Sequence, residues 1–207
     1  MDETAKANRQ TKRRRQILSA TLRLLRRHGS GISTAQIAAE SNCSKETMYS
    51  WFGDREGIFL ALAQEQAEAM STALHSSLRK SENETFHNKI HKSCVSLLDI
   101  MTGEALIAVN RAAMAESCRE KADLGLTILD DWQARIAQPM LDLIEEGRAE
   151  GIVEFSDPAE ALDILMGLLI GDRQRRLLLG EDARPDFAAM ENHARKAANM
   201  WIRLHSV

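Results

Sequence analysis

Two short helical segments joined by a tight turn are predicted between residues 33 and 52, and they constrain the fold and function more than any other feature. Ser33, followed by Gln36, has the capping-box spacing that begins a helix. The turn is predicted at Ser41-Asn42-Cys43, because Asn adopts the left-handed conformation more readily than most residues. Ser44 is then expected to cap the second helix. This pattern is typical of a helix-turn-helix, whose second helix enters the major groove of duplex DNA.

The first turn of that second helix carries small polar and charged side chains. The N-terminal residues of a reading helix point deepest into the groove. The candidates for base contacts are therefore Ser44, Lys45, Glu46 and Thr47. Ser50 is expected to contact either a base or a phosphate. Glu46 leaves two outcomes open, since its carboxylate accepts from a cytosine amino group or weakens contact with phosphate.

Charge is distributed unevenly along the chain, although the net charge is only -3. Residues 1–60 carry a net charge of +5, and the remainder carries -8. A basic N-terminal region on an acidic remainder indicates a polyanionic partner for that region alone. Within it, Arg13, Arg14 and Arg15 are expected to reach a minor groove or flanking phosphates.

The chain is predicted to be all-α. Apolar residues make up 44% of it and recur at helical spacing, and only 3 prolines occur. We expect a mobile N-terminal arm (1–10), a three-helix DNA-binding head with the helix-turn-helix (11–57), a connecting helix (58–80) and a C-terminal helical domain (81–207). Besides the helices of residues 33–80, the expected helices are Thr11–His28, Thr85–Met101, Glu104–Ser117, Lys121–Glu150 (kinked or split at Pro139), Asp157–Leu179 and Pro185–His205.

Several classes of function are disfavoured by what the sequence lacks. There is no Gly-rich phosphate loop, no HExxH motif and no nucleophile accompanied by residues that could activate it. We therefore expect neither an enzyme nor a cofactor. No hydrophobic signal core and no apolar stretch of about 20 residues is present. Cys43, Cys94 and Cys118 form no CxxC pair, which favours reduced thiols and a cytoplasmic location.

His87, His91 and Cys94 share one helical face at spacings of four and three residues. Imidazole and thiolate ligands at such spacing would suit zinc or copper. Lys89 and Lys92 add positive charge nearby, and no fourth ligand follows. We therefore expect no metal site. A zinc or copper site at these three residues is the alternative.

The helix-turn-helix and the segments around it resemble the TetR/AcrR family of bacterial transcriptional regulators. The matching residues are Ile17–Leu25, Gly29 and Ser33–Phe59. Within them, Tyr49–Phe59 is similar to the family's Tyr-x-x-Phe-x-x-Lys-Glu-x-Leu segment. A weaker likeness extends to residues 147–152, 157–158 and 167–171. The resemblance implies a homodimer in which each subunit has a DNA-binding head and an all-helical, ligand-binding body.

The resemblance also implies phosphate contacts in the head, which carry affinity rather than sequence preference. The residues in the matching positions are Thr34, Tyr49, Trp51 and Arg55. Thr34 would offer its hydroxyl and an unpaired backbone N–H at a helix start. Arg55 takes the family's lysine position. Asn42 replaces the family's usual turn glycine, and Glu46 replaces a usually small residue.

In the body, adaptable and polar side chains are the candidates for a ligand site. Methionine fills irregular space, and an indole with a cation can orient a planar or anionic ligand. The candidates are Met101, Met114, Trp132, Arg135 and Met166. Each methionine is equally explained as ordinary core.

Two late apolar stripes are expected to form the dimer interface. They consist of Leu162, Leu165 and Leu169 on one helix, and of Ala194, Ala198 and Trp201 on the next. Two such helices from each subunit can build a four-helix bundle about a two-fold axis. The alternative is that both stripes only fill the core of the monomer.

These features together predict a regulator, with repression as the default. A homodimer would bind a near-palindromic operator and be released by a small molecule. The alternatives are an effector-free helix-turn-helix regulator and, from another class, a helical ligand-binding protein or enzyme.

Overall fold

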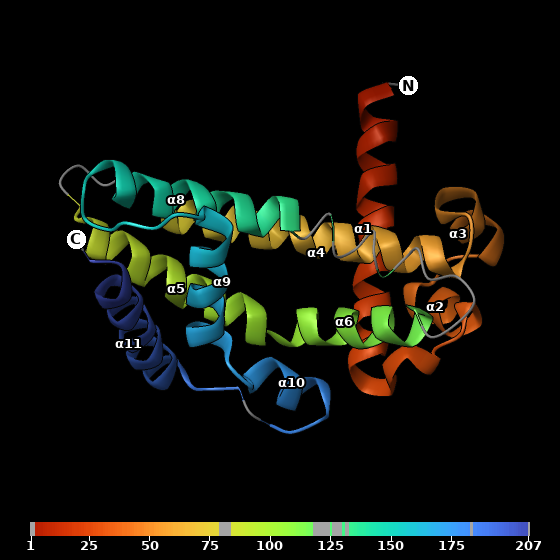
Figure 1. The fold of residues 1–207 in the computed structure, drawn as a ribbon. Coiled ribbons are helices and arrows are strands. Elements are labelled where there is room, and N and C mark those ends of the chain that lie inside the picture. Colours follow the sequence, from red (N-terminus) through yellow and green to blue (C-terminus); the bar gives the residue numbers. More distant parts are fainter. Residues whose placement is uncertain are drawn as a thin grey trace. The chain divides into compact units, whose positions relative to one another are not determined.

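A computed structural model of the chain describes residues 3–78, 84–117, 125, 130, 133–182 and 184–206 (Figure 1). Within these residues the elements are helical, and an isolated bridge joins Val153 to Ser206. The predicted all-α class is confirmed. The elements are α1 (Glu3–His28), η1 (Gly29–Gly31), α2 (Thr34–Ser41), α3 (Lys45–Phe52), α4 (Arg55–Leu78), α5 (Phe86–Thr102), α6 (Glu104–Ser117), η2 (Gln133–Ala137), α8 (Gln138–Ala149), α9 (Pro158–Ile170), α10 (Arg173–Leu178) and α11 (Phe187–His205).

The chain divides into two compact units, each with its own hydrophobic core. Unit 1 comprises Met1–Gln66 and Ala108–Leu129, and unit 2 comprises Ala67–Ile107 and Asp130–Val207. Helices α4 and α6 therefore each contribute residues to both units. This division differs from the expected domain boundary near residue 80, because the second half of α4 packs into the core of unit 2.

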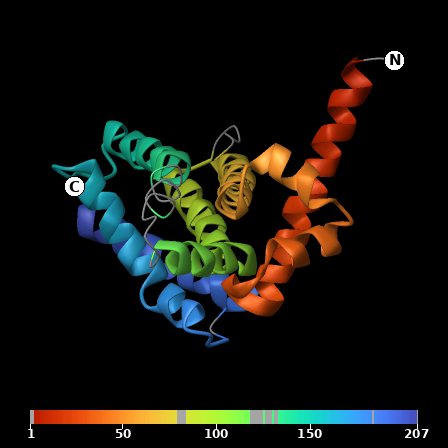
Figure 2. The ribbon, with the colours of Figure 1, turned by 90° about the vertical axis from the view of Figure 1, so that its right-hand side faces the viewer.

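Unit 1 is built on α1, which packs against η1 and α2, while α2 packs against α3. The first turns of α1 project beyond the other helices of this unit in both ribbon views (Figures 1 and 2). Apolar side chains of α1, α2, α3, α4 and α6 meet in one core, together with Ile32. Its largest fully buried side chains include Ile17, Ile32, Ile37, Met48, Ile58 and Leu62.

Unit 2 is organised around α5, which contacts α8, α9, α10 and α11 (Figure 1). α5 begins at the Thr85 cap, whose hydroxyl accepts from the Asn88 N–H. Asp157 and Asp186 cap α9 and α11 in the same way, as their positions before apolar runs predict. Local polar caps thus fix where the core helices begin.

Two expected helix boundaries are wrong. α1 begins at Glu3 rather than Thr11, because no Pro or Gly interrupts the polar residues before the apolar stripe. The helix expected to run to Leu179 ends at Ile170, where Gly171 has φ +52° and the chain turns before α10 begins. Pro139 falls in the first turn of α8, where its missing N–H costs no helical hydrogen bond.

Of the described helices, none alone is both long and apolar enough to cross a membrane. α5 and α6 meet the criteria of length and composition only together, as a bent pair.

Candidate nucleic-acid interface

The turn between α2 and α3 has the predicted geometry. Ser33 accepts from the Gln36 N–H, and the Gln36 side chain accepts from the Ser33 N–H, which completes the capping box. Asn42 lies in the left-handed region at φ 52° and ψ 47°, and its N–H bonds back to α2. Ser44 then caps α3 by accepting from the Thr47 N–H. These local contacts fix the direction in which α3 leaves the turn.

α3 has one face in the core and one in solvent. Met48 and Phe52 are buried among the apolar residues of unit 1. The opposite face is exposed at Ser44, Lys45, Glu46, Tyr49 and Ser50, whereas Thr47 is half-buried. The polar surface expected to meet DNA is therefore open to solvent, and the opposite side of α3 is packed in the core.

Thr34 and Tyr49 lie together at one edge of this surface. Their hydroxyl oxygens are 3.0 Å apart, and the Tyr49 side chain is 42% exposed. Thr34 also begins α2, so its backbone N–H lies at the positive end of that helix. One of these hydroxyls donates to the other, so the remaining hydroxyl proton and the Thr34 backbone N–H are the donors that this helix start can offer to a phosphate.

Glu46 is positioned by the start of its own helix. Its carboxylate accepts from the Glu46 backbone N–H and from the Ser44 hydroxyl, and these hydrogen bonds lower its pKa. An ionised carboxylate at this site also interacts favourably with the helix dipole. In this arrangement Glu46 contributes to capping α3.

The structure gives Arg55 a different place from the phosphate contact that the resemblance implied. Its side chain is 22% exposed and donates to Glu116 at 2.6 Å and to the backbone carbonyls of Ser30 and Ile32. The guanidinium also lies 4.6 Å from the centre of the Phe59 ring. Arg55 is thus held by unit 1 itself, and contacting a phosphate would require breaking these bonds.

The remaining predicted contact in the head, Trp51, is half-buried and packs against the core of unit 1. Two arginines of α1 have roles that the sequence did not indicate. Arg13 donates to the carbonyl of Asn42, which ties α1 to the turn, and Arg14 lies 4.8 Å from the Phe52 ring centre. Long side chains reach across to other helices, so spacing along α1 cannot reveal these partners.

In unit 2 a cavity of about 140 Å³ lies among α5, η2, α8 and α9. Its lining residues are Leu97, Ile136, Ala137, Met140, Leu162, Asp163 and Met166. Among the predicted ligand residues, Met166 lines this cavity. Met101 instead belongs to the apolar core, and Arg135 pairs with Glu68.

Two further predicted ligand residues lie elsewhere. Met114 is 58% exposed on the part of α6 that belongs to unit 1, and it does not line the cavity of unit 2. Trp132 lies outside the described residues.

The six predicted dimer residues face inward. Leu162, Leu165, Leu169, Ala194, Ala198 and Trp201 are all buried within the single chain. Trp201 is fully buried, and its indole donates to the Ala161 carbonyl at 2.7 Å. Their prediction as interface residues is therefore wrong, because α9 and α11 use this face against each other and α5.

His87, His91 and Cys94 do not form a ligand set. His87 is exposed, His91 lies 3.4 Å from the Glu191 carbonyl, and Cys94 is buried in the core of unit 2. Burial raises the pKa of the Cys94 thiol to about 12, which keeps it protonated. Within the described part of the chain, no three His, Cys, Asp or Glu side chains are grouped to hold a metal ion.

Comparisons with known proteins cover both ends of the chain. Residues 17–62 match a family described as bacterial regulatory proteins of the tetR family, and residues 89–206 match the C-terminal domain of AefR-like transcriptional repressors. A relative in Bacillus subtilis, the uncharacterized HTH-type transcriptional regulator YvkB, is 24% identical over 170 residues, which span 81% of this chain and 84% of that protein.

Solved structures show the same fold. A TetR transcriptional regulator from Agrobacterium tumefaciens is 31% identical, with 95% of each chain covered and a TM-score of 0.77. A Mesorhizobium loti protein assigned to the TetR family is 21% identical and has a TM-score of 0.84, over 95% of this chain and 98% of that one.

Proposed function

Because the chain belongs to the TetR family of bacterial transcriptional regulators, we propose that it acts as a homodimeric repressor that binds a near-palindromic operator and is released by a small molecule. The observation that carries the DNA-reading role is the exposed polar face of α3. Lys45 and Ser50 lie on that face, with Met48 and Phe52 buried behind it. We assign base reading to residues 44–47 and phosphate contacts to Thr34 and Tyr49.

We place the dimer interface on the outer faces of α9 and α11. These helices expose apolar side chains at Ile164, Met200 and Leu204, which are 37%, 52% and 66% exposed. Met200 and Leu204 are four residues apart and so share one side of α11. A two-fold pairing of such a face with itself would bury them and leave the inward stripe in the core.

We place the effector in the cavity of unit 2, whose lining favours a small and mainly apolar molecule. A ligand there would contact α8 and α9, and the same unit contains half of α4. We propose that a shift of α4 or α6, the two helices shared by both units, changes how the heads meet DNA. Such a switch needs only a difference in ligand affinity between the two arrangements.

Tyr49→Phe tests the phosphate contact. The substitution removes one hydroxyl and is expected to weaken duplex binding by about 1 kcal/mol, roughly fivefold. Because phosphates carry no sequence, the loss should be equal for the promoter of the protein's own gene and for an unrelated duplex. Fluorescence anisotropy measures both affinities, and an unchanged thermal midpoint is the control. Wild-type affinity for both duplexes would remove Tyr49 from the interface.

A further inference from the structure

A polar groove of about 730 Å³ lies between the N-terminal half of α1 and the C-terminal end of α2, within unit 1. The described polar residues along α1 recur at helical spacing, so they form a row on one side of that helix. The α1 residues of the row are Asn8, Lys12, Arg15, Ser19 and Arg23, and Glu40, Ser41 and Asn42 form the facing wall.

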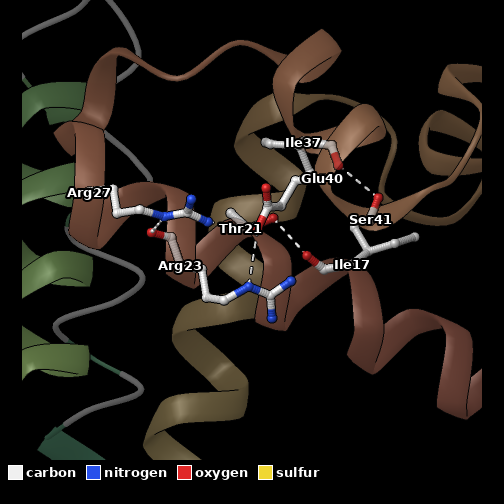
Figure 3. Close-up of polar contacts among 7 residues, drawn as sticks. All are labelled: Ile17, Thr21, Arg23, Arg27, Ile37, Glu40 and Ser41. Carbon is white, nitrogen blue, oxygen red and sulfur yellow. Dashed lines mark hydrogen bonds and ion pairs between the residues drawn. The ribbon is translucent and has the colours of Figure 1, made fainter.

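The groove carries an excess of positive charge. Four basic residues line it, and Glu40 is the acid among its lining residues. Glu40 is already paired with Arg23 at 3.2 Å and with Arg27 at 2.7 Å (Figure 3). Hydrogen bonds from these arginines lower the pKa of Glu40, so its charge is present and compensated. The groove therefore offers net positive charge to an anion.

Lys12 and Arg15 differ in whether their charge already interacts with an acidic side chain. Lys12 is exposed and forms no ion pair with another described residue. Arg15 interacts electrostatically with Glu65 of α4. Burial raises the pKa of Glu65, and the charge of Arg15 acts in the opposite direction. Lys12 is accordingly the cation most available to a ligand in this groove.

The groove is anchored to the reading helix. Arg13, which also lines the groove, donates to the carbonyl of Asn42, two residues before the Ser44 cap of α3. Ser41, in the facing wall, donates its hydroxyl to the carbonyl of Ile37 (Figure 3). The same hydroxyl lies 3.3 Å from the carbonyl oxygen of Ala38. From Asn8 to Ser19 the row is about 16 Å long at the rise of an α-helix. One strand of a duplex presents a phosphate about every 3.4 Å along its axis, so the row spans several phosphates.

We propose that this groove binds the sugar-phosphate backbone of duplex DNA beside the bases read by α3, with Lys12 and Arg15 contacting phosphates. The inference rests on the proposed function, and it adds a contact outside the helix-turn-helix. It also assigns a use to the turns of α1 that precede the apolar stripe. A linear row of cations and neutral donors fits a phosphodiester chain, which presents successive charges along one direction.

The test is the salt dependence of binding to a labelled duplex of random sequence. The logarithm of the binding constant falls linearly with the logarithm of KCl concentration, with a slope of about -0.9 per neutralised phosphate. Lys12→Ala is expected to reduce the magnitude of the slope by about 0.9, and Lys12→Ala with Arg15→Ala by about twice that. Arg26→Ala is the matched control, since it removes the same charge from α1 outside the groove and should leave the slope unchanged.

The other possible outcomes contradict either the groove contact alone or the proposed function as well. Wild-type slopes in both groove variants, with weaker binding in Lys45→Ala, would overturn the groove contact and leave the proposed function standing. No duplex binding by the wild type would overturn both. Replacing KCl by potassium phosphate at equal ionic strength tests whether the groove instead binds free inorganic phosphate. If phosphate weakens duplex binding by the wild type more than KCl does, and Lys12→Ala abolishes this difference, the groove would be assigned to inorganic phosphate. The DNA assignment would then be overturned.

Discussion

Trp201→Ala is expected to lower the free energy of unfolding by about 4 kcal/mol, the typical cost of deleting a buried aromatic side chain. Trp201 is fully buried in the core of unit 2, where its ring packs beside Phe155 and His205. Its removal leaves a cavity and also removes the hydrogen bond from its indole N–H to the Ala161 carbonyl. Urea titration followed by circular dichroism measures the loss.

Leu204→Glu is the contrasting control for that experiment. Leu204 is 66% exposed, so the substitution should leave the stability of the folded subunit nearly unchanged. If the outer face of α11 forms the dimer, a charge there should convert dimers into monomers, as light scattering would show. A Trp201→Ala protein that keeps wild-type stability but becomes monomeric would return Trp201 to the interface.

Arg55→Ala is expected to destabilise the protein by about 3 kcal/mol, because it removes one partner of a largely buried ion pair with Glu116. It also removes the donors to two carbonyls before α2, at Ser30 and Ile32. Denaturant unfolding again measures the loss. Arg55→Lys should recover part of the stability, since an ammonium can pair with Glu116 but lacks the planar fork of donors.

The same variants decide between the two roles for Arg55. If Arg55 is structural, its substitution should lower stability, and duplex affinity should fall only in proportion to the folded fraction of the protein. If Arg55→Ala retained full stability and lost affinity with a reduced salt slope, the phosphate contact implied by the family resemblance would be correct.

The features that could be predicted from sequence are those whose cause is local. The caps Ser33 and Ser44 act on residues three positions away, and Asn42 adopts the left-handed turn through its own backbone preference. The exposed face of α3 follows from the same locality, because Met48 and Phe52 are four residues apart and fix the buried side. Fold class and the position of the reading helix were therefore accessible.

The contacts that could not be predicted join residues far apart in sequence. Arg55 and Glu116 are 61 positions apart, and no pattern within either helix specifies the other. The stripe containing Leu165 and Trp201 shows an equivalent ambiguity. Periodicity reveals that one helix face is apolar, but it does not say whether its partner is the same chain or a second copy. Packing against α5 decides in favour of the same chain.

Selection of duplexes from a random-sequence pool tests most directly whether residues 44–47 read bases. The wild-type protein is predicted to enrich a near-palindromic site with two half-sites about one helical turn or slightly more apart. Lys45→Ala combined with Thr47→Ala should lose preference at defined positions in each half-site, because each base contact contributes about 1–3 kcal/mol of discrimination. Enrichment of the same sequence by both proteins, with equal preference at every position, would contradict this assignment.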